Sequence, residues 1–395
     1  YCLGIIVWGS SSAMPLLAGS DKAIYAELKS LEPISVIATR GDRLISDVPN
    51  SVNIIDGNEI NRRNSKDIKE LLSDDLDVEV RSQGARFGIS SGVGRTGQES
   101  INIRGLEGNR VLMMVDGIRM PHSFDYSSAS VGRGDYVELD GIGQIEILKG
   151  PSSTQYGSDG LAAAVNFKTV TADQLLKDRE KTAVIKAGYR SINESSSGSV
   201  RLAQRGLDWS ALLISSLTSG AQTINQGIID VPDANRTKPN PENNHQRYLL
   251  AKIEKQLSGA QNIVLTLEDV SKYRKTNLYT ARTSTIFDHQ AKDQLKRQRI
   301  SIDVITKKRV FGFEDESLIK FWLQQARVNQ LSIEDRQIDR SRHNNLFDNS
   351  VGINANWVNY QDGEISRKWT YGFDVQQSRI TQAVNRSGDY DDVVK

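Results

Sequence analysis

From about residue 181 to the end of the chain, apolar and polar residues alternate along long stretches. Alternation with a period of two predicts β-strands with one apolar and one polar face. The segments 316–330 and 345–360 exceed the ~5–6 residues of an ordinary strand and match tilted membrane-spanning strands of ~9–11 residues with extensions. Shared faces include Ala183, Ile185, Ala187 and Tyr189, then Trp209, Leu213 and Leu217, and later Val351, Ile353, Ala355 and Trp357.

The connections between these strands differ in length. Long polar segments at 222–246 and 273–296 alternate with short turns such as 257–260. Together with aromatic residues near strand ends, this asymmetry is expected of an outer-membrane β-barrel. The alternative is a large soluble β-sandwich.

About nine strands are predicted between residues 181 and 395. A membrane barrel has to close, because an open half-barrel leaves edges that lipid cannot satisfy. We therefore expect the barrel to be incomplete at the C-terminus.

The segment 41–170 has a different texture, with many glycines and short apolar runs such as 52–55, 111–115 and 145–148. Such runs predict a compact mixed α/β domain. One helix is expected at 65–73, with Ser65 as its N-cap. The predicted fold class is therefore mainly β: an N-terminal mixed α/β domain at 41–170, followed by an antiparallel transmembrane β-barrel at 181–395.

The first twenty residues resemble a secretory signal peptide, because an apolar run is followed by small residues. We expect export on this basis, with a buried N-terminal strand as the alternative. Cys2 opens the apolar run, whereas a lipidated cysteine should close it, so a lipoprotein anchor is not predicted.

Composition narrows the classes further. Lys plus Arg is 50 and Asp plus Glu is 49, so the net charge of +1 gives no indication of a nucleic-acid partner. A hydrophobic fraction of 38% and a mean hydropathy of −0.45 exclude a helical membrane protein but fit a membrane barrel. One cysteine excludes an intrachain disulfide and a thiolate zinc cluster, and the four scattered histidines predict no preformed metal site.

No motif in the chain predicts catalysis. The segment 92–97 matches G-x-G-x-x-G, but residues 98–104 alternate like a strand where a dinucleotide site needs a helix. Its glycines are better interpreted as loop positions that need a positive φ. Asp-Gly pairs such as Asp116-Gly117 are interpreted as turns. We therefore predict that the protein is not an enzyme.

The most informative runs are 101–119, 145–160 and 164–169. They contain "IRG", "VDG" and an "IE…GP…S…YG…AVN" series in order, and they closely resemble the plug domain of TonB-dependent outer-membrane receptors. Ala162, Ala163 and Ala164 depart from the family, which often has glycines there. The resemblance implies a plug at 41–170 enclosed by a barrel in the bacterial outer membrane, with lipid around the barrel.

The resemblance also assigns a tail at 21–40 that contains a TonB box: Ile34, Ser35, Val36, Ile37 and Ala38. A short β-prone segment can add as a strand to the sheet edge of TonB, the partner energised by an inner-membrane complex. The alternative is a simple first strand of the plug. Arg104 and Glu146 lie in plug motifs, and we expect them to seat the plug by contacting the barrel wall or each other's strands; ordinary solvated charges are the alternative.

Within the family, the chain resembles haem and haemoglobin receptors, at the run 109–119 and at the junction 169–177. This implies haem as the transported ligand, taken from haemoglobin or another carrier. His122 is then the candidate axial ligand at the plug apex, with a second ligand beyond residue 395. Alternatives are a non-transporting receptor, or a ferric-siderophore receptor that uses Phe124, Tyr126 and Arg133.

Overall fold

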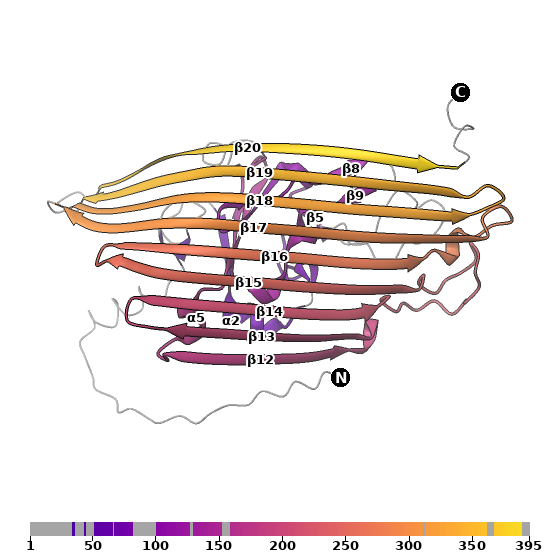
Figure 1. Cartoon of the computed structure of the whole chain (residues 1–395), viewed down its shortest axis with the longest axis horizontal. Helices are drawn as coiled ribbons and strands as arrows, with labels where there is room; N and C mark the ends of the chain where they lie inside the picture. Colours follow the sequence, from indigo (N-terminus) through magenta and orange to yellow (C-terminus); the bar gives the residue numbers. More distant parts are fainter. Residues whose placement is uncertain are drawn as a thin grey trace.

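The computed structural model places a small mixed domain against one face of a large sheet (Figure 1). We call the first part the plug and the large sheet the strand wall. The structure describes residues 34–35, 43–44, 51–65, 67–81, 100–126, 129–151, 159–310, 313–361 and 367–388. The signal-peptide-like segment 1–20 and the glycine motif 92–97 lie outside these residues.

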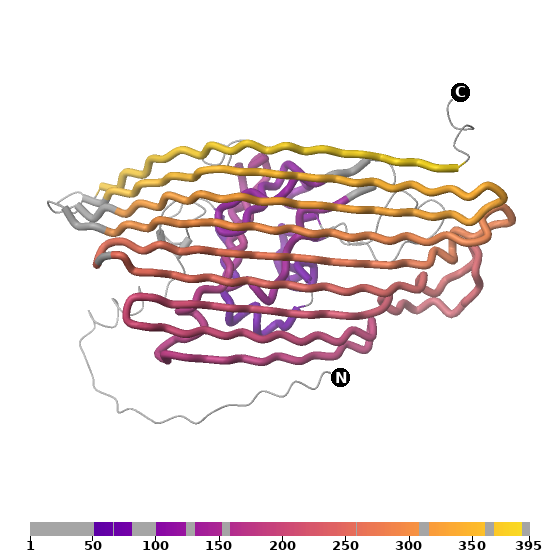
Figure 2. Tube along the Cα trace, in the orientation of Figure 1, coloured from indigo at the N-terminus to yellow at the C-terminus, as the bar shows by residue number. Residues whose placement is uncertain are grey.

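The strand wall contains nine strands, each antiparallel to the next, in sequence order. The Cα trace in Figure 2 shows them side by side, with the plug across one face. Its strands are β12 (Lys181–Arg190), β13 (Ser195–Arg205), β14 (Trp209–Ala221), β15 (Glu242–Ser258), β16 (Gln261–Asn277), β17 (Asp288–Val310), β18 (Phe313–Asp335), β19 (Arg340–Gln361) and β20 (Arg367–Ser387). The up-and-down order and the number of strands confirm the prediction, and β12 and β20 are the edges of an unclosed sheet.

Alternation sorts the side chains of the wall between two environments. On β17, the side chain of Ile300 is 38% exposed on the outer face, whereas Arg299 beside it is buried against the plug. The same parity puts Leu267 and Leu323 on the outer face and Glu268 and Gln324 on the inner face. The polar face therefore lies toward the plug, and the apolar face lies outward.

The prediction of a long polar loop at 273–296 was wrong. Strand β16 continues to Asn277 and β17 begins at Asp288, so the connection is 278–287. Polar residues such as Lys275 and Lys292 are paired strand positions. The strands continue beyond their apolar stretch. Their polar ends do not alternate between apolar and polar residues, so the sequence pattern did not predict them as strand. The other long connection is 222–241 and precedes β15.

The core of the plug is a five-stranded sheet in the order β3-β10-β11-β6-β7. Its β11 and β6 are parallel, and its other neighbours are antiparallel. These strands are β3 (Ser51–Asp56), β6 (Val111–Val115), β7 (Ile118–Arg119), β10 (Ile142–Lys149) and β11 (Ala163–Thr169). Smaller pairs are β1 (Ile34–Ser35) with β2 (Arg43–Leu44), β4 (Val78–Arg81) with β5 (Ser100–Ile103), and β8 (Phe124–Tyr126) with β9 (Ala129–Val131).

The expected helix at 65–73 was wrong in its bounds. The structure has α3 (Ile68–Leu71), whose N-cap is Asp67 rather than Ser65. A second helix, α2 (Gly57–Arg63), starts at the Asp56-Gly57 pair, because the Asp56 carboxylate accepts from the Glu59 N–H as an N-cap. A third, α5 (Ala172–Leu176), begins at a Thr171–Gln174 capping box. None of the helices described is long and apolar enough to cross a membrane.

Short 3₁₀ turns connect the strands. They are η3 (Gly108–Arg110), η4 (Arg133–Tyr136), η5 (Leu139–Gly141), η6 (Ser191–Asn193) and η7 (Tyr279–Ala281).

The plug core and the wall form one packed interior. The apolar cluster of the plug, which includes Tyr136 and Phe167, continues into Leu295, Val328 and Leu346 of the wall. At Gly141 the two parts approach so closely that an added Cβ would lie 1.8 Å from the Tyr248 hydroxyl of β15. Only glycine fits there, and this contact helps to fix where the plug sits.

We predict that Gly141→Ala loosens the plug by about 1–3 kcal/mol, because the methyl group overpacks a buried contact with Tyr248. The Val170 amide, which donates to the Gly141 carbonyl, should exchange its hydrogen faster. Gly259→Ala is the control, because nothing lies within 4 Å of its Cβ position. Tyr248→Ala in the Gly141→Ala background should restore slow exchange; equal exchange in both single variants would contradict the prediction.

Candidate functional site

The turn after β6 is the point of the plug that contacts the wall most directly. Asp116 and Gly117 both have positive φ, 50° and 78°, and they connect β6 to β7. The Asp116 carboxylate accepts from the Thr169 N–H (2.8 Å) and hydroxyl (2.6 Å), and the Gly117 N–H donates to the Asn166 side chain (3.0 Å). The turn is therefore held rigidly within the plug before it meets the wall.

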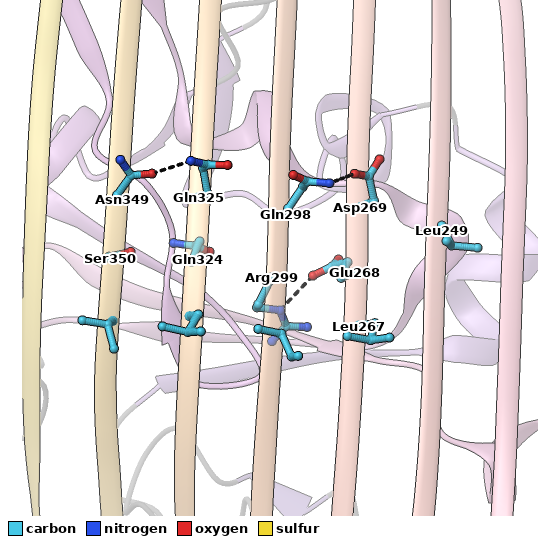
Figure 3. Close-up of a pocket in the computed structure, with 13 residues that line it drawn as sticks. Leu249, Leu267, Glu268, Asp269, Gln298, Arg299, Gln324, Gln325, Asn349 and Ser350 are labelled. Carbon is cyan, nitrogen blue, oxygen red and sulfur yellow. Dashed lines mark hydrogen bonds and ion pairs between the residues drawn. The ribbon is translucent and has the colours of Figure 1, made fainter.

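Arg299 of β17 binds this turn. Its guanidinium donates to the Asp116 carboxylate (2.7 Å) and the Val115 carbonyl (3.1 Å), and its Nε donates to Glu268 of β16 (2.9 Å). Figure 3 shows Arg299 and Glu268 joined on adjacent strands. Arg297 also pairs with Glu268, at 2.9 Å. The guanidinium is fully shielded from solvent and lies among anionic and carbonyl oxygens.

Lys320 of β18 completes the cluster. Its ammonium group donates to the Asp116 carbonyl (2.6 Å) and pairs with Asp303 of β17 (3.0 Å). Burial alone would raise the pKa of Asp116, but the nearby cations Lys252, Arg299 and Lys320 hold that pKa well below its usual value. The Asp116 carboxylate is therefore an anion at neutral pH, between plug and wall.

A second contact lies further along the same plug segment. The Arg119 carbonyl accepts from Gln324 of β18 (3.0 Å). The His122 N–H donates to the Asp348 carboxylate of β19 (3.2 Å), and its ring Nδ1 lies 3.6 Å from the same oxygen. The Asp348 side chain is 6% exposed and also accepts from Ser378 (2.9 Å), whereas the His122 side chain is 43% exposed. The buried Asp348 carboxylate of the wall thus contacts a partly exposed histidine, His122.

The candidate residues from the sequence fall into different environments. Arg133 is 2% exposed, and its guanidinium bonds Asp159 (2.7 Å) and the Val111 carbonyl (3.0 Å), so it is a plug-core residue and not the apex side chain that we expected. Phe124 and Tyr126 belong to β8, but their side chains lie outside the described part of the structure.

The expected seating residues make their recorded contacts within the plug. Arg104, which has a φ of 55°, lies 3.8 Å from Asp77. Glu146 is fully buried and pairs with Lys168 at 2.5 Å. The expected contacts of Arg104 and Glu146 with the barrel wall or with each other's strands stay predictions. Asp116, interpreted from sequence only as a turn residue, is one of the plug residues that contact the wall.

The TonB-box residues are described only in part. Ile34 and Ser35 form β1, which pairs with β2, and Val36, Ile37 and Ala38 lie outside the described residues. Within the described residues, no group of three or more His, Cys, Asp or Glu side chains is arranged to hold a metal ion.

The buried residues Glu268, Arg299 and Asp348 were missed by sequence analysis. Each occupies an inward position of an alternating strand, and a charged residue at such a position was the available signal. The sequence does not show which inward charges meet the plug, because the partners are 183 positions apart for Arg299 and Asp116 and 226 for His122 and Asp348.

We predict that Arg299→Met weakens the seating of the plug by about 3 kcal/mol, because Asp116 and Glu268 remain buried with a lost partner. Hydrogen exchange in β6 and β7 should rise. Lys307→Gln is the control, since its pair with Glu316 is exposed and should matter little.

The pH dependence follows from the depressed pKa of Asp116. Its charge should stabilise the plug fully above the unfolded-state pKa of about 3.9, and the effect should disappear as the pH falls to the lower folded-state value. Unchanged exchange in Arg299→Met at neutral pH would refute the role of the cluster.

Comparison with protein families gives a match for the plug. Residues 45–164 match the TonB-dependent Receptor Plug Domain. Among curated proteins, Transferrin-binding protein A of Haemophilus influenzae is 30% identical over 237 residues, which is 57% of this chain and 25% of that protein. Hemoglobin-binding protein A of Haemophilus influenzae is 24% identical over 292 residues, which is 67% of this chain and 26% of that protein.

Heme/hemopexin utilization protein C of Haemophilus influenzae is 32% identical over 173 residues, covering 43% of this chain and 21% of that protein. The matched regions therefore span about a quarter of the curated relatives.

Solved structures share the fold. The FrpB iron transporter from Neisseria meningitidis superposes with a TM-score of 0.55 at 13% identity, covering 85% of this chain and 61% of that chain. The ferric yersiniabactin uptake receptor FyuA from Yersinia pestis superposes with a TM-score of 0.52 at 9% identity, covering 85% and 62%. Residues 45–164 are therefore similar to the plug domain of TonB-dependent receptors, and the chain shares the fold of these solved receptors.

Proposed function

We propose that this protein is an outer-membrane receptor that imports haem iron, taken from haemoglobin or another haem carrier, with energy supplied by TonB. It is a receptor and transporter rather than an enzyme, and haem is its cargo rather than a resident cofactor. The observation that carries the proposal is the geometry of His122. Two relatives support the ligand class, since their names refer to hemoglobin and to heme/hemopexin.

The position of His122 suits an axial ligand. Its partner Asp348 lies eight residues from the first residue of β19 and thirteen from the last, so it is nearer the end of the wall with the long connections 222–241 and 278–287. Longer loops mark the extracellular end of such barrels. A ligand that arrives from outside would meet this end first.

The contact with Asp348 suits metal ligation chemically. Histidines that bind metals usually direct their second ring nitrogen at a carboxylate, which fixes the ring and makes the ligating nitrogen more basic. Here Nδ1 faces the buried Asp348, so Nε2 is the nitrogen left for iron. An ordinary solvated loop histidine is not expected to contact a buried carboxylate of the wall.

We expect His122→Ala to weaken haem binding by the intact receptor and to shift the Soret band, because an axial ligand is lost. Asp348→Asn should weaken haem affinity by about tenfold with a smaller spectral change, since the ring loses its orienting charge. His245→Ala is the matched control, because this histidine stacks on Tyr273 in the wall, away from the plug.

The outcomes separate the alternatives. An unchanged spectrum and affinity in His122→Ala would remove His122 from the site. If the unmodified receptor binds a ferric siderophore but no haem, the siderophore alternative holds instead, although Arg133 is already engaged in the plug core. Growth on transferrin-bound iron alone would favour the relatives named for transferrin binding.

Energy coupling is tested separately at the TonB box. Val36→Pro should abolish haem uptake by the intact receptor and leave haem binding unchanged, because proline removes a backbone donor that strand addition to TonB requires. Val36→Thr keeps the donor and the β-propensity and is the control. Normal uptake by the proline variant would rule out this segment as the TonB box.

A further inference from the structure

The outer face of the strand wall changes from apolar to cationic within a few residues of strand. One rung across the wall, defined by cross-strand pairing, consists of Ala251, Leu267, Ile300, Leu323 and Val351. Its large side chains are exposed outward. An outward apolar rung on a wall of this fold faces hydrocarbon.

The next rung toward the long connections is mostly polar and carries one charge: it consists of Leu249, Asp269, Gln298, Gln325 and Asn349. Gln298 donates to Asp269 (2.7 Å), and Gln325 donates to Asn349 (2.9 Å). Figure 3 shows both pairs on the outer side of the strands, beside the apolar rung. Polar side chains that hydrogen-bond to one another are suited to the boundary between hydrocarbon and water.

The rung after that carries positive charge. Arg247, Ser271, Lys296 and Arg327 follow one another across β15 to β18 in direct register. Two rungs further, Lys275 is directly opposite Lys292. Like charges directly opposite one another in a sheet are destabilising. The wall places two such pairs, Lys296 with Arg327 and Lys275 with Lys292, on the same face.

Among the residues that the structure describes, few side chains neutralise this band. Asp269 is the one acidic side chain on the outer face of β15 to β18 from its own rung to that of Lys275, and it lies 3.6 Å from Lys296. Arg327 stacks on Phe347 at 5.0 Å. Within the described residues, Arg247, Lys275 and Lys292 make no ion pair.

The height of the band matches a lipid head-group layer. Four residues of β17 separate Ile300 from Lys296, which is about 13 Å along the strand and about 10 Å along the normal of a barrel whose strands tilt by ~40°. The polar layer of a bilayer begins within such a distance of buried hydrocarbon. The long connections at this end of the strands put the band in the outer leaflet.

We propose that Arg247, Lys296 and Arg327, with Lys275 and Lys292 above them, bind the phosphate groups of a lipid head group in the outer leaflet. The bound anion relieves the repulsion within the two like-charged pairs. This site rests on the outer-membrane location proposed above, but it is independent of haem and of His122.

The test uses the intact receptor in nanodiscs of phosphatidylcholine doped with diphosphoryl lipid A or with fully dephosphorylated lipid A. Native mass spectrometry measures the lipid retained. The double variant Lys296→Gln/Arg327→Gln should bind diphosphoryl lipid A about tenfold more weakly, and the unmodified protein should lose binding as salt rises. The charge-preserving double variant Lys296→Arg/Arg327→Lys should retain binding.

The control is Lys255→Gln/Lys307→Gln, which removes two exposed lysines near the opposite ends of their strands. Without lipid, Lys296→Gln/Arg327→Gln should be at least as heat-stable as the unmodified protein, because repulsion is removed. Equal losses in the control variant, equal binding of dephosphorylated lipid, or displacement by inorganic phosphate would each overturn the lipid site. Haem titration of the same samples reports separately on the proposed function.

Discussion

The seating of the plug depends on one buried cation, the Arg299 guanidinium. The guanidinium is buried, and Asp116, Glu268 and the Val115 carbonyl together accept its hydrogen bonds. If any one of these partners moved away, a buried charge would lose a hydrogen-bond partner, which is costly. A buried ion pair of this kind contributes little to net stability but strongly selects one geometry, because misalignment is costly. We infer that the cluster sets the position of the plug, while apolar packing supplies its stability.

The same plug segment carries the candidate ligand. Between the Asp116 turn and His122, the wall holds the chain at the Arg119 carbonyl through Gln324 and at His122 through Asp348. Strands β17, β18 and β19 thus all contact one short, continuous segment, residues 115–122. A ligand bound to His122 acts on a segment that ends in the ion cluster around Arg299. Ligand binding at His122 and the position of the plug are therefore connected through contiguous contacts.

Sequence patterns predicted the local and periodic features of the fold, and they missed contacts between residues that are far apart in the sequence. Alternation predicted the nine strands and their faces, because parity is a property of neighbouring residues. The helix at 65–73 shifted, because Asp67 rather than Ser65 accepts the capping hydrogen bond. The siderophore alternative placed Arg133 at the plug apex, and only the folded chain shows that its guanidinium pairs with Asp159. The ion cluster was unpredictable for the same reason, since register between plug and wall is decided across the whole fold.

The polar ends of the long strands resemble loops in the sequence. They explain how one sheet can extend through three environments: hydrocarbon, lipid head groups and water. Strand β17 has 23 residues, so it is about 75 Å long, whereas the apolar band of a membrane barrel is only about 25 Å tall. Most of the strand is therefore outside hydrocarbon. Alternation continues there, but the outer positions change from isoleucine to glutamine to lysine while the inner positions near Arg299 face the plug. Because backbone pairing does not depend on side-chain polarity, a single ladder can cross from lipid through head groups to water without a break, and the outer side chains adapt to each layer in turn.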